Sequence, residues 1–386
     1  MSVTYLSSHT HIAGRKCMQP RRRSLALVPA AAVGALVACA LALVLALKRS
    51  RPPPEMATAA AAALALPPIG LGTFGLSPAK AGPAVRSALA AGYRALDCAP
   101  VYFNEREIGD ALSAELVPGG AIRREDLWVT SKLASPFHRG EHVGPALRKT
   151  LTDLKLEYLD LYLVHWPVAF RHVSIDPDGP RGWDGPDGAI DYSIDDSDGG
   201  RNIDPSVTVG ETWSAMEELV DQGLVRNIGV SNFPAALLRE LLAGCRIAPL
   251  VNQVELHPYL QQRGLVDYCR ERGVGVQAYS PLGTPGYRDD ELGEAEPSVL
   301  DDPVLVEMAR GKGVSVARLC VAWALRRGTA LNAKSASAER QEDNLAALTD
   351  PVELTDADME LIDGLDRGHR YFRPEDWWGA AGAVFD

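Results

Sequence analysis

Residues 127–165 read LWVTSKLASPFHRGEHVGPALRKTLTDLKLEYLDLYLVH and contain one complete strand–helix–strand pattern. Leu127–Ser131 and Leu159–His165 are short apolar runs of the kind that form buried strands, and Val143–Leu154 has apolar residues at helical spacing between them. Strands that are joined through a helix pair in parallel. This stretch therefore predicts an α/β fold with a parallel sheet.

The same alternation extends in both directions from this stretch, beginning at Pro67. The other predicted strands are Ile69–Gly72, Ala95–Asp97, Val225–Ser231, Leu250–Glu255, Gly275–Tyr279 and Thr329–Ala333. The other predicted helices include Pro83–Ala91, Glu105–Glu115, Glu211–Gln222, Ala235–Leu242, Leu265–Glu271 and Val304–Arg310. Eight strands in about 265 residues fit a closed (β/α)8 TIM barrel better than an open doubly wound sheet, so we expect one catalytic domain over residues 67–386.

A segment of different composition precedes the barrel. Residues 24–47 carry no charge, and as a helix they are long enough to cross a bilayer; arginines and a lysine flank them on both sides. We predict a basic tail over 1–23, a transmembrane helix over 24–47 that anchors the protein in a membrane, and a Pro- and Ala-rich linker over 48–66. Two alternatives stay open: a cleaved leader, and translation from Met56, which would leave a cytoplasmic protein.

The rest of the chain is acidic. The whole sequence has a net charge of −11, and leaving out the residues before Met56 leaves 31 basic and 49 acidic residues, a net charge of −18. Such a body repels phosphate backbones, which excludes nucleic acid as a partner, and an anionic ligand needs a local basic cluster. The six cysteines are scattered without a C-x-x-C pair, so we expect reduced thiols and no metal site.

Polar side chains follow the predicted strands at the ends where barrel enzymes place their catalytic groups. Asp97 ends the second strand, Lys132 follows the third and His165 ends the fourth. The later strands end at Ser231 and Asn232, at Gln253 and Glu255, at Tyr279 and at Lys334, while Tyr102 follows Asp97 closely. One such residue is readily explained as a helix cap or a solvated charge. A polar group at so many strand ends predicts an active site.

Four of these residues suit one kind of chemistry. A tyrosine has an unperturbed pKa of about 10, and a nearby ammonium lowers it. Lys132 can supply that ammonium and Asp97 can hold it, while His165 can donate a hydrogen bond to a carbonyl oxygen. We therefore expect Tyr102 to protonate this oxygen as a hydride from a cofactor reaches the carbon.

A second motif is a decoy. Gly70-Leu71-Gly72-Thr73-Phe74-Gly75 matches the dinucleotide fingerprint G-x-G-x-x-G, but Ser77-Pro78 intervenes before any predicted helix. We expect a tight turn at the barrel entrance, with Phe74 projecting into the pocket. The long loops over 167–208 and 281–302 both follow strands, which favours lids over the same face.

Several ordered motifs resemble the aldo-keto reductases. They are GYRALDCAPVYFNEREIG at 92–109, SKL at 131–133, LYLVHWP at 161–167, GVSNF at 229–233, VNQVELHPYLQQ at 251–262 and AYSPLG at 278–283. The similarity covers essentially all of the chain from Pro67. The segments HWPVAFRHV, SNFPAALLRELL and RYFRPEDWW look closest to the xylose reductase and aldose reductase branch.

The resemblance implies a catalytic tetrad and an NADP(H) site. The tetrad is Asp97, Tyr102, Lys132 and His165. The implied cofactor residues are Ser231, Asn232 and Gln253 for the nicotinamide carboxamide, Tyr279 for the ring, Ser280 and Leu282 for the pyrophosphate, and Lys334, Ser335, Arg340 and Asn344 for the 2′-phosphate. The implied substrate contacts are Phe74, Trp166 and His165, with Phe137 on the same apolar wall. The implied activity is NADPH-dependent reduction of aldehydes or open-chain aldoses to alcohols.

Three positions depart from the family's pattern. Leu331-Asn332-Ala333-Lys334-Ser335 stands where I-P-K-S is usual, and Ala338 replaces the usual Pro before Glu-Arg; both changes loosen the phosphate clamp but keep its cations. Ala134 replaces a frequent aromatic residue and predicts a wider pocket. The alternatives are a reductase of ketones or xenobiotic carbonyls and a membrane-attached, NADPH-binding sensor with little turnover. A metal-dependent barrel hydrolase lacks the additional His and carboxylate ligands that it would need.

Overall fold

The computed structural model describes residues 66–116, 120, 122–174, 203–284, 297–378 and 384–385. The predicted tail over 1–23 and the predicted transmembrane helix over 24–47 lie outside these residues, as do the linker up to residue 65 and the middle of each long loop. Within the described ranges no helix is long and apolar enough to cross a membrane. The anchor over 24–47 therefore stays a prediction, as do the two lids.

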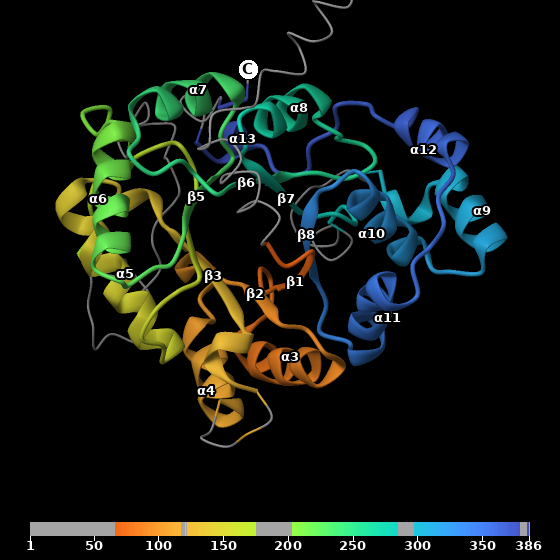
Figure 1. Cartoon of the computed structure of the whole chain (residues 1–386), viewed down its shortest axis with the longest axis horizontal. Helices are drawn as coiled ribbons and strands as arrows, with labels where there is room; N and C mark the ends of the chain where they lie inside the picture. The colour runs from red at the N-terminus through yellow and green to blue at the C-terminus, as the bar shows by residue number, and fades with distance from the viewer. Residues whose placement is uncertain are drawn as a thin grey trace, which may run out of the picture. The chain divides into compact units, whose positions relative to one another are not determined.

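Among the described residues, eight parallel strands close into a barrel, in which each strand bonds to the next and the last returns to the first (Figure 1). They are β1 Ile69–Gly72, β2 Ala95–Asp97, β3 Trp128–Leu133, β4 Leu161–Val164, β5 Ile228–Ser231, β6 Val251–Glu255, β7 Gly275–Tyr279 and β8 Ala330–Lys334. The predicted (β/α)8 barrel is thus confirmed.

Helices surround the barrel (Figure 1). They are α3 Pro78–Ala91, α4 Glu105–Glu115, α5 Gly140–Leu154, α6 Val209–Asp221, α7 Ala235–Gly244, α8 Arg263–Glu271, α9 Pro303–Lys312, α10 Val316–Arg326 and α11 Ala338–Thr349, and after them α12 Asp356–Asp363 and α13 Pro374–Trp378. Helix α3 begins at Pro78, five residues before the predicted start at Pro83. The reason is that Pro78 itself occupies the first turn, where its missing N–H costs no hydrogen bond.

The barrel interior changes from apolar to polar along the strands. Leu161 and Val251, at the amino ends of β4 and β6, are buried together with Leu163, Leu66 and Leu250. Toward the carboxyl ends the buried interior side chains are polar; they include Asp97, Lys132, Gln253, Gln277 and Asn332. Burial of polar groups is unfavourable unless they form hydrogen bonds. The polar side chains at this end of the barrel therefore bond to one another.

The glycines of the decoy motif serve the barrel and its entrance. Gly70 and Gly72 lie in β1, and a Cβ on Gly70 would lie 2.2 Å from the Oδ1 atom of Asn332. Gly75 has a φ of 69° in the turn that follows, a conformation that favours glycine. The motif therefore leaves room for a neighbouring side chain and forms the turn, in agreement with the sequence interpretation.

The first long loop begins and ends at neighbouring points of the structure. Phe170 and Ile203 form an isolated antiparallel bridge, so the described residues before and after the loop's middle part lie side by side. Arg139 ties the later part to α5 through Asp204, at 2.7 Å. The start of the loop, which carries Trp166, is thereby held over the carboxyl face of the barrel.

Candidate active site

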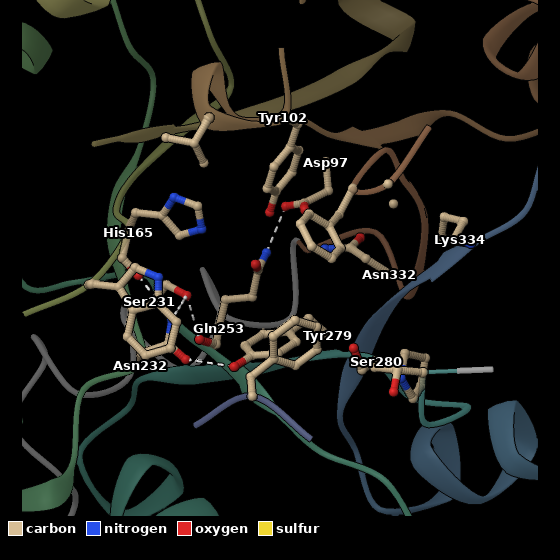
Figure 2. Close-up of a pocket in the computed structure, with 18 of the residues that line it drawn as sticks. Asp97, Tyr102, His165, Ser231, Asn232, Gln253, Tyr279, Ser280, Asn332 and Lys334 are labelled. Atoms are coloured by element: carbon tan, nitrogen blue, oxygen red, sulfur yellow. Dashed lines mark hydrogen bonds between the residues drawn. The ribbon is translucent and has the colours of Figure 1, made fainter. Parts of the chain in front are cut away.

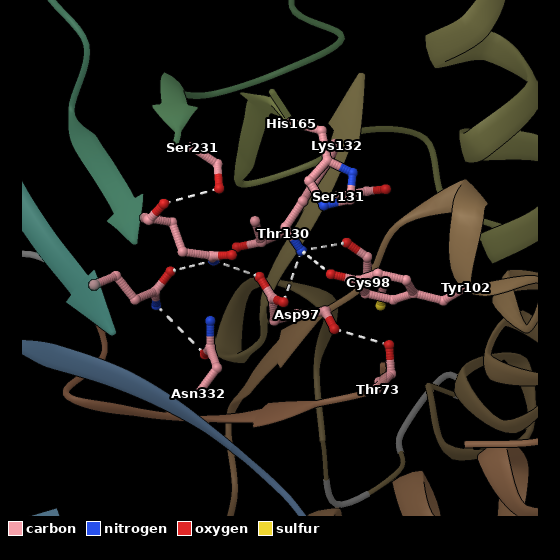
Figure 3. A network of polar contacts seen from close by, with 12 residues as sticks. Thr73, Asp97, Cys98, Tyr102, Thr130, Ser131, Lys132, His165, Ser231 and Asn332 are labelled. Atoms are coloured by element: carbon pink, nitrogen blue, oxygen red, sulfur yellow. Dashed lines mark hydrogen bonds and ion pairs between the residues drawn. The ribbon is translucent and has the colours of Figure 1, made fainter. Parts of the chain in front are cut away.

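The structure brings the four predicted catalytic side chains together at the carboxyl ends of β2, β3 and β4 (Figure 3). Lys132 is the centre of the group. Its Nζ atom lies 2.7 Å from Oδ2 of Asp97, donates to the carbonyl oxygen of Cys98 at 3.0 Å and lies 3.1 Å from the hydroxyl oxygen of Tyr102. The His165 ring meets the Tyr102 ring edge to face, with centroids 5.9 Å apart.

Lys132 differs in position from its prediction. It lies within β3, which continues to Leu133, whereas the sequence pattern placed it after the strand. Strand residues alternate between two faces, and this alternation directs the Lys132 side chain into the barrel, where it is fully buried. The ammonium is consequently fixed by three oxygen partners and has no access to bulk water.

The Tyr102 phenol keeps its proton at neutral pH. Burial raises its pKa to about 12, although the Lys132 ammonium acts in the opposite direction; the Asp97 carboxylate adds to the rise. The expectation that Lys132 would bring this pKa toward neutrality is therefore wrong for the net value, because desolvation of the phenolate outweighs the attraction of the ammonium. A protonated phenol is the state that a proton donor requires.

The pKa values of Lys132 and His165 are shifted in opposite directions and for different reasons. Burial disfavours the Lys132 ammonium, but Asp97 and Tyr102 together raise its pKa above the usual value, so the ammonium stays charged. Burial, followed by the nearby Lys132 and His138, holds the pKa of His165 well below the ordinary range. The imidazole is therefore neutral near pH 7, and it can donate an N–H to an oxygen while the phenol supplies the proton.

A cavity of about 370 Å³ opens beside these four residues (Figure 2). Its apolar lining comes from Phe74, Val101, Ala134, Trp166, Phe372 and Trp378. The Phe74 ring contacts the Tyr102 ring at 5.1 Å between centroids, as expected for a residue that projects into the pocket. Phe137 does not line the cavity; it is buried in the core, edge to face with His172, and this part of the predicted wall is wrong.

Two of the cavity's aromatic residues come from the C-terminal segment and were not predicted. The main-chain N–H groups of Tyr371 and Phe372 donate to the buried Glu255 carboxylate at 2.8 and 3.3 Å, and this fixes Phe372 against the cavity. Trp378 lies at the end of α13 and packs on Trp166, with centroids 5.2 Å apart. The only sequence signal was the aromatic cluster RYFRPEDWW, whose place in space depends on the barrel.

Polar side chains from β5, β6 and β7 line the cavity next to the catalytic group. Asn232 Nδ2 donates to the main-chain oxygen of His165 at 3.0 Å and to Ser231 Oγ at 3.1 Å, and the Tyr279 hydroxyl donates to Asn232 Oδ1 at 2.9 Å. Gln253 lies alongside (Figure 2). The cavity also has Ser280 and Leu282 in its lining, so all six residues predicted for the nicotinamide and pyrophosphate are brought to it.

The residues predicted to hold the 2′-phosphate divide into two pairs. Lys334 lines the cavity, and Arg340 is exposed in the first turn of α11. Ser335 and Asn344 are buried and outside the cavity lining: Ser335 Oγ bonds the main chain of Ser337, and the Asn344 side chain bonds the Tyr93 hydroxyl.

Lys80 is a third cation at this place and was not predicted. Partial burial, and then the charges of Arg340 and Lys80, lower the pKa of Lys334. Repulsion of this kind means that Lys80, from α3, lies close enough to act on Lys334. Of the three cations only Lys334 lines the cavity, and in an acidic protein a lysine with two further cations near it suits a phosphate. The cavity thus offers an amide-rich end and a cationic end, which fits a nicotinamide dinucleotide phosphate.

Fold and site together define a carbonyl oxidoreductase built on a (β/α)8 barrel. Residues 68–367 match the model of the aldo/keto reductase family, and the chain belongs to that family. It is 44% identical over 312 residues to an aldo/keto reductase of Synechocystis sp., covering 81% of this chain and 89% of that one. It is 40% identical over 311 residues to human aldo-keto reductase family 1 member A1, with 80% and 89% covered.

A solved structure gives the same result. The aldose reductase of Schistosoma japonicum superposes with a TM-score of 0.71 at 36% identity, over 83% of this chain and 95% of that one. Aldo-keto reductases of this kind use NADP(H) as cofactor, and the chain is an NADP-dependent oxidoreductase.

Proposed function

We propose that the protein reduces aldehydes, or the open-chain form of aldoses, to alcohols with NADPH. The observation that carries this proposal is the contact of a protonated Tyr102 hydroxyl with the buried Lys132 ammonium beside a cavity lined by aromatic residues. One relative supports the substrate class by its name, the aldose reductase of Schistosoma japonicum, and the human aldo-keto reductase family 1 member A1 supports carbonyl reduction in general. When bound, NADPH supplies the hydride.

The chain's own residues supply the proton and hold the carbonyl group. The neutral His165 imidazole donates an N–H to the carbonyl oxygen and orients it, and the Tyr102 hydroxyl protonates the same oxygen. The Lys132 ammonium, 3.1 Å away, stabilises the phenolate that remains, and Asp97 fixes the ammonium at 2.7 Å. Because these charges lie in a buried, low-dielectric place, their effect on the phenolate is larger than in water.

The cofactor contacts are proposed for the residues that surround the cavity. Ser231, Asn232 and Gln253 hold the nicotinamide carboxamide, and the Tyr279 ring lies against the nicotinamide. Ser280 and Leu282 contact the pyrophosphate, and the 2′-phosphate is bound by Lys334, Arg340 and Lys80. The support is the position of the first seven in the cavity lining and the effect of the Arg340 and Lys80 charges, which lower the pKa of Lys334. Ser335 and Asn344 support the phosphate site without contacting the cavity. Ser335 bonds the main chain of Ser337, which precedes α11, and Asn344 bonds the Tyr93 hydroxyl.

One observation favours a second class of substrate. Ala134 lines the cavity, where its small side chain leaves room next to the catalytic group. Ketones and other bulky carbonyl compounds are therefore candidates for the same chemistry. Phe74 and Trp166 would contact the apolar part of either substrate.

The proposal is tested by following NADPH oxidation by the full-length protein over a panel of aldehydes, pentoses and ketones. We expect turnover of several aldehydes or aldoses, with lower kcat/KM for ketones. A higher kcat/KM for ketones would favour the second class. NADPH binding without turnover of any compound would contradict the reductase and support the sensor.

We also propose that residues 24–47 anchor the barrel to a membrane. The support is the uncharged length of this segment and the basic residues on both sides of it. The test is expression of the full-length protein in cells, followed by alkaline extraction of the membranes. Retention in the membrane pellet is expected, and recovery in the supernatant, with residues 1–66 still present by mass spectrometry, would contradict the anchor.

A further inference from the structure

Three side-chain amides lead across the barrel interior from the Asp97 carboxylate to β8 (Figure 3). The Nε2 atom of Gln253 donates to Asp97 Oδ1 at 2.7 Å and to Gln277 Oε1 at 2.8 Å. The Nε2 atom of Gln277 donates in turn to Asn332 Oδ1 at 3.4 Å. All four side chains are buried. Gln277 and Asn332 have no role in the tetrad or in the cofactor contacts proposed above.

The direction of this amide chain is fixed at its Asp97 end. A carboxylate paired with an ammonium accepts hydrogen bonds only, so Gln253 must turn its NH2 group toward Asp97. The second N–H of the same NH2 group goes to Gln277. Both donors of Gln253 are then used, and only its oxygen is left for the cavity that it lines.

Asn232 presents the same polarity to the cavity. Its two N–H groups go to the main-chain oxygen of His165 and to Ser231 Oγ. Its oxygen accepts from the Tyr279 hydroxyl at 2.9 Å and keeps a second lone pair. The two amides at this end of the cavity therefore offer acceptors and no donors.

Asn332, the last of the hydrogen-bonded amides, lies close to Gly70 of β1. A Cβ atom on Gly70 would lie 2.2 Å from Asn332 Oδ1, so the glycine is what lets this amide lie against β1. The pattern I-P-K-S, usual in the family, aligns an isoleucine with position 332, and isoleucine has no acceptor for Gln277.

We propose that Gln277, held by Asn332, engages the second N–H of Gln253, so that Gln253 presents only its oxygen and the cavity selects a carboxamide over a carboxylate. The proposal rests on the function proposed above, in which Gln253 and Asn232 hold the nicotinamide carboxamide. A carboxamide NH2 offers two donors to the two waiting oxygens. A carboxylate has no N–H to donate, so its oxygens would face the oxygens of Gln253 and Asn232 without a hydrogen bond and would be repelled by them. Gln277 and Asn332 are positioning residues, because they act through Gln253.

Loss of Gln277 is expected to change the affinities for a carboxamide and for a carboxylate in opposite directions. Without its oxygen, one N–H of Gln253 has no buried acceptor, and the amide can turn this donor toward the cavity. The site then accommodates a carboxylate better, while the carboxamide loses part of its fit. If Gln277 only filled space in the barrel, its loss would lower the affinity for both ligands to the same extent.

The test compares the Kd of NADP⁺ with that of its nicotinic acid analogue, which has a carboxylate in place of the carboxamide. Isothermal titration calorimetry is done on the full-length protein, its Gln277→Met variant, similar in size but without an amide, and its Asn332→Ala variant. The wild type should bind the carboxamide form about 100-fold more tightly. In Gln277→Met this preference should fall about tenfold, with a smaller fall in Asn332→Ala.

The matched control is Gln261→Met, which removes a buried glutamine whose amide bonds the main chain of Pro258 and Ile362 instead. It should leave the preference unchanged. An unchanged preference in Gln277→Met would overturn the proposal, and if that variant does not fold, an unchanged preference in Asn332→Ala overturns it. Failure of the wild type to bind NADP⁺ would instead refute the cofactor site, so the two failures are distinguishable.

Discussion

The Nζ atom of Lys132 lies 3.1 Å from the hydroxyl oxygen of Tyr102, in a place where the lysine side chain is fully buried. The ammonium has exchanged water for protein oxygens, and its charge is balanced by Asp97 at 2.7 Å. In the proposed mechanism this arrangement leaves the phenol protonated before the reaction and stabilises the phenolate after proton transfer. It also makes the site depend on a buried ion pair, which has consequences for stability as well as for turnover.

Lys132→Met is expected to lower both activity and stability. It removes the group that stabilises the phenolate, and it leaves the Asp97 carboxylate buried with Gln253 as its remaining side-chain partner. Removal of one member of a buried pair costs about 3 to 5 kcal/mol. Urea unfolding and kcat measure the two effects. The double variant Asp97→Asn with Lys132→Met should regain part of the stability and none of the activity; equal stability of the single variant and the wild type would contradict this account.

Glu105→Gln is expected to change how stability depends on pH. Glu105 is buried at the start of α4 and accepts from Ser131 Oγ at 2.6 Å; burial raises its pKa to about 8 from an ordinary value of 4.5. The folded protein thus holds a proton that the unfolded chain releases above pH 4.5, so the free energy of unfolding falls as the pH rises from 4.5 to 8.

The glutamine variant lacks this proton and should not show that fall. Urea denaturation at several pH values measures the difference, which should be absent below pH 4.5 and reach the order of 1 to 4 kcal/mol near pH 8. Ser87→Ala, which also removes a hydrogen-bonding side chain but no titrating group, should keep the wild-type pH dependence. Parallel curves for wild type and Glu105→Gln would show that the carboxyl is ionised in the folded protein.

Glu255→Gln is expected to raise KM for bulky aldehydes with little change in kcat. The carboxylate accepts from the main-chain N–H groups of Tyr371 and Phe372, and an amide would turn a donor toward one of them. Hydrogen bonds to a charged group contribute about 1.5 to 3 kcal/mol, so a KM increase of about tenfold is reasonable. Steady-state kinetics measure it. Glu375→Gln, an exposed residue on α13, is the control, and an unchanged KM in Glu255→Gln would remove Glu255 as the anchor.

Arg340→Ala and Lys80→Ala are each expected to weaken NADPH binding about tenfold, because each removes a charge-assisted contact to the 2′-phosphate. NADH lacks this phosphate and should bind the variants and the wild type equally well, which makes it the internal control. Fluorescence titration measures both affinities. Loss of affinity for NADH as well would mean that the variants disturb the barrel, and full retention of NADPH affinity would refute the clamp.

The strand ends were predictable because a parallel sheet has a simple sequence pattern. Apolar runs that alternate with amphipathic stretches gave the barrel, and closure of the barrel then brings Asp97, Lys132 and His165 to one face. Lys80 and Phe372 were not predicted, because nothing near them in sequence marks a site. The return of β8 to β1 brings Lys334 near Lys80, and the bond of the C-terminal segment to Glu255 brings Phe372 to the cavity.

Other differences come from effects that a sequence does not display. The net pKa of Tyr102 depends on how completely the phenol is buried, and the sequence analysis considered only the lysine. Phe137 is apolar and follows β3, as a pocket residue would, but the short turn at Ser135–Phe137 directs it into the core.

The helices α10, α11 and α12 were not named beforehand, although Ser315, Ser337 and Thr355 cap their first turns as the usual start signals do.

The central claim is that the Tyr102 hydroxyl protonates the carbonyl oxygen, and Tyr102→Phe tests it most directly. This variant keeps the ring and removes the proton, so NADPH should bind with unchanged Kd while kcat for the best aldehyde of the panel falls by about 10² to 10⁴. Fluorescence titration gives the Kd of NADPH, and steady-state oxidation of NADPH with that aldehyde at saturation gives kcat. A kcat close to that of the wild type, with NADPH bound normally, would contradict the account.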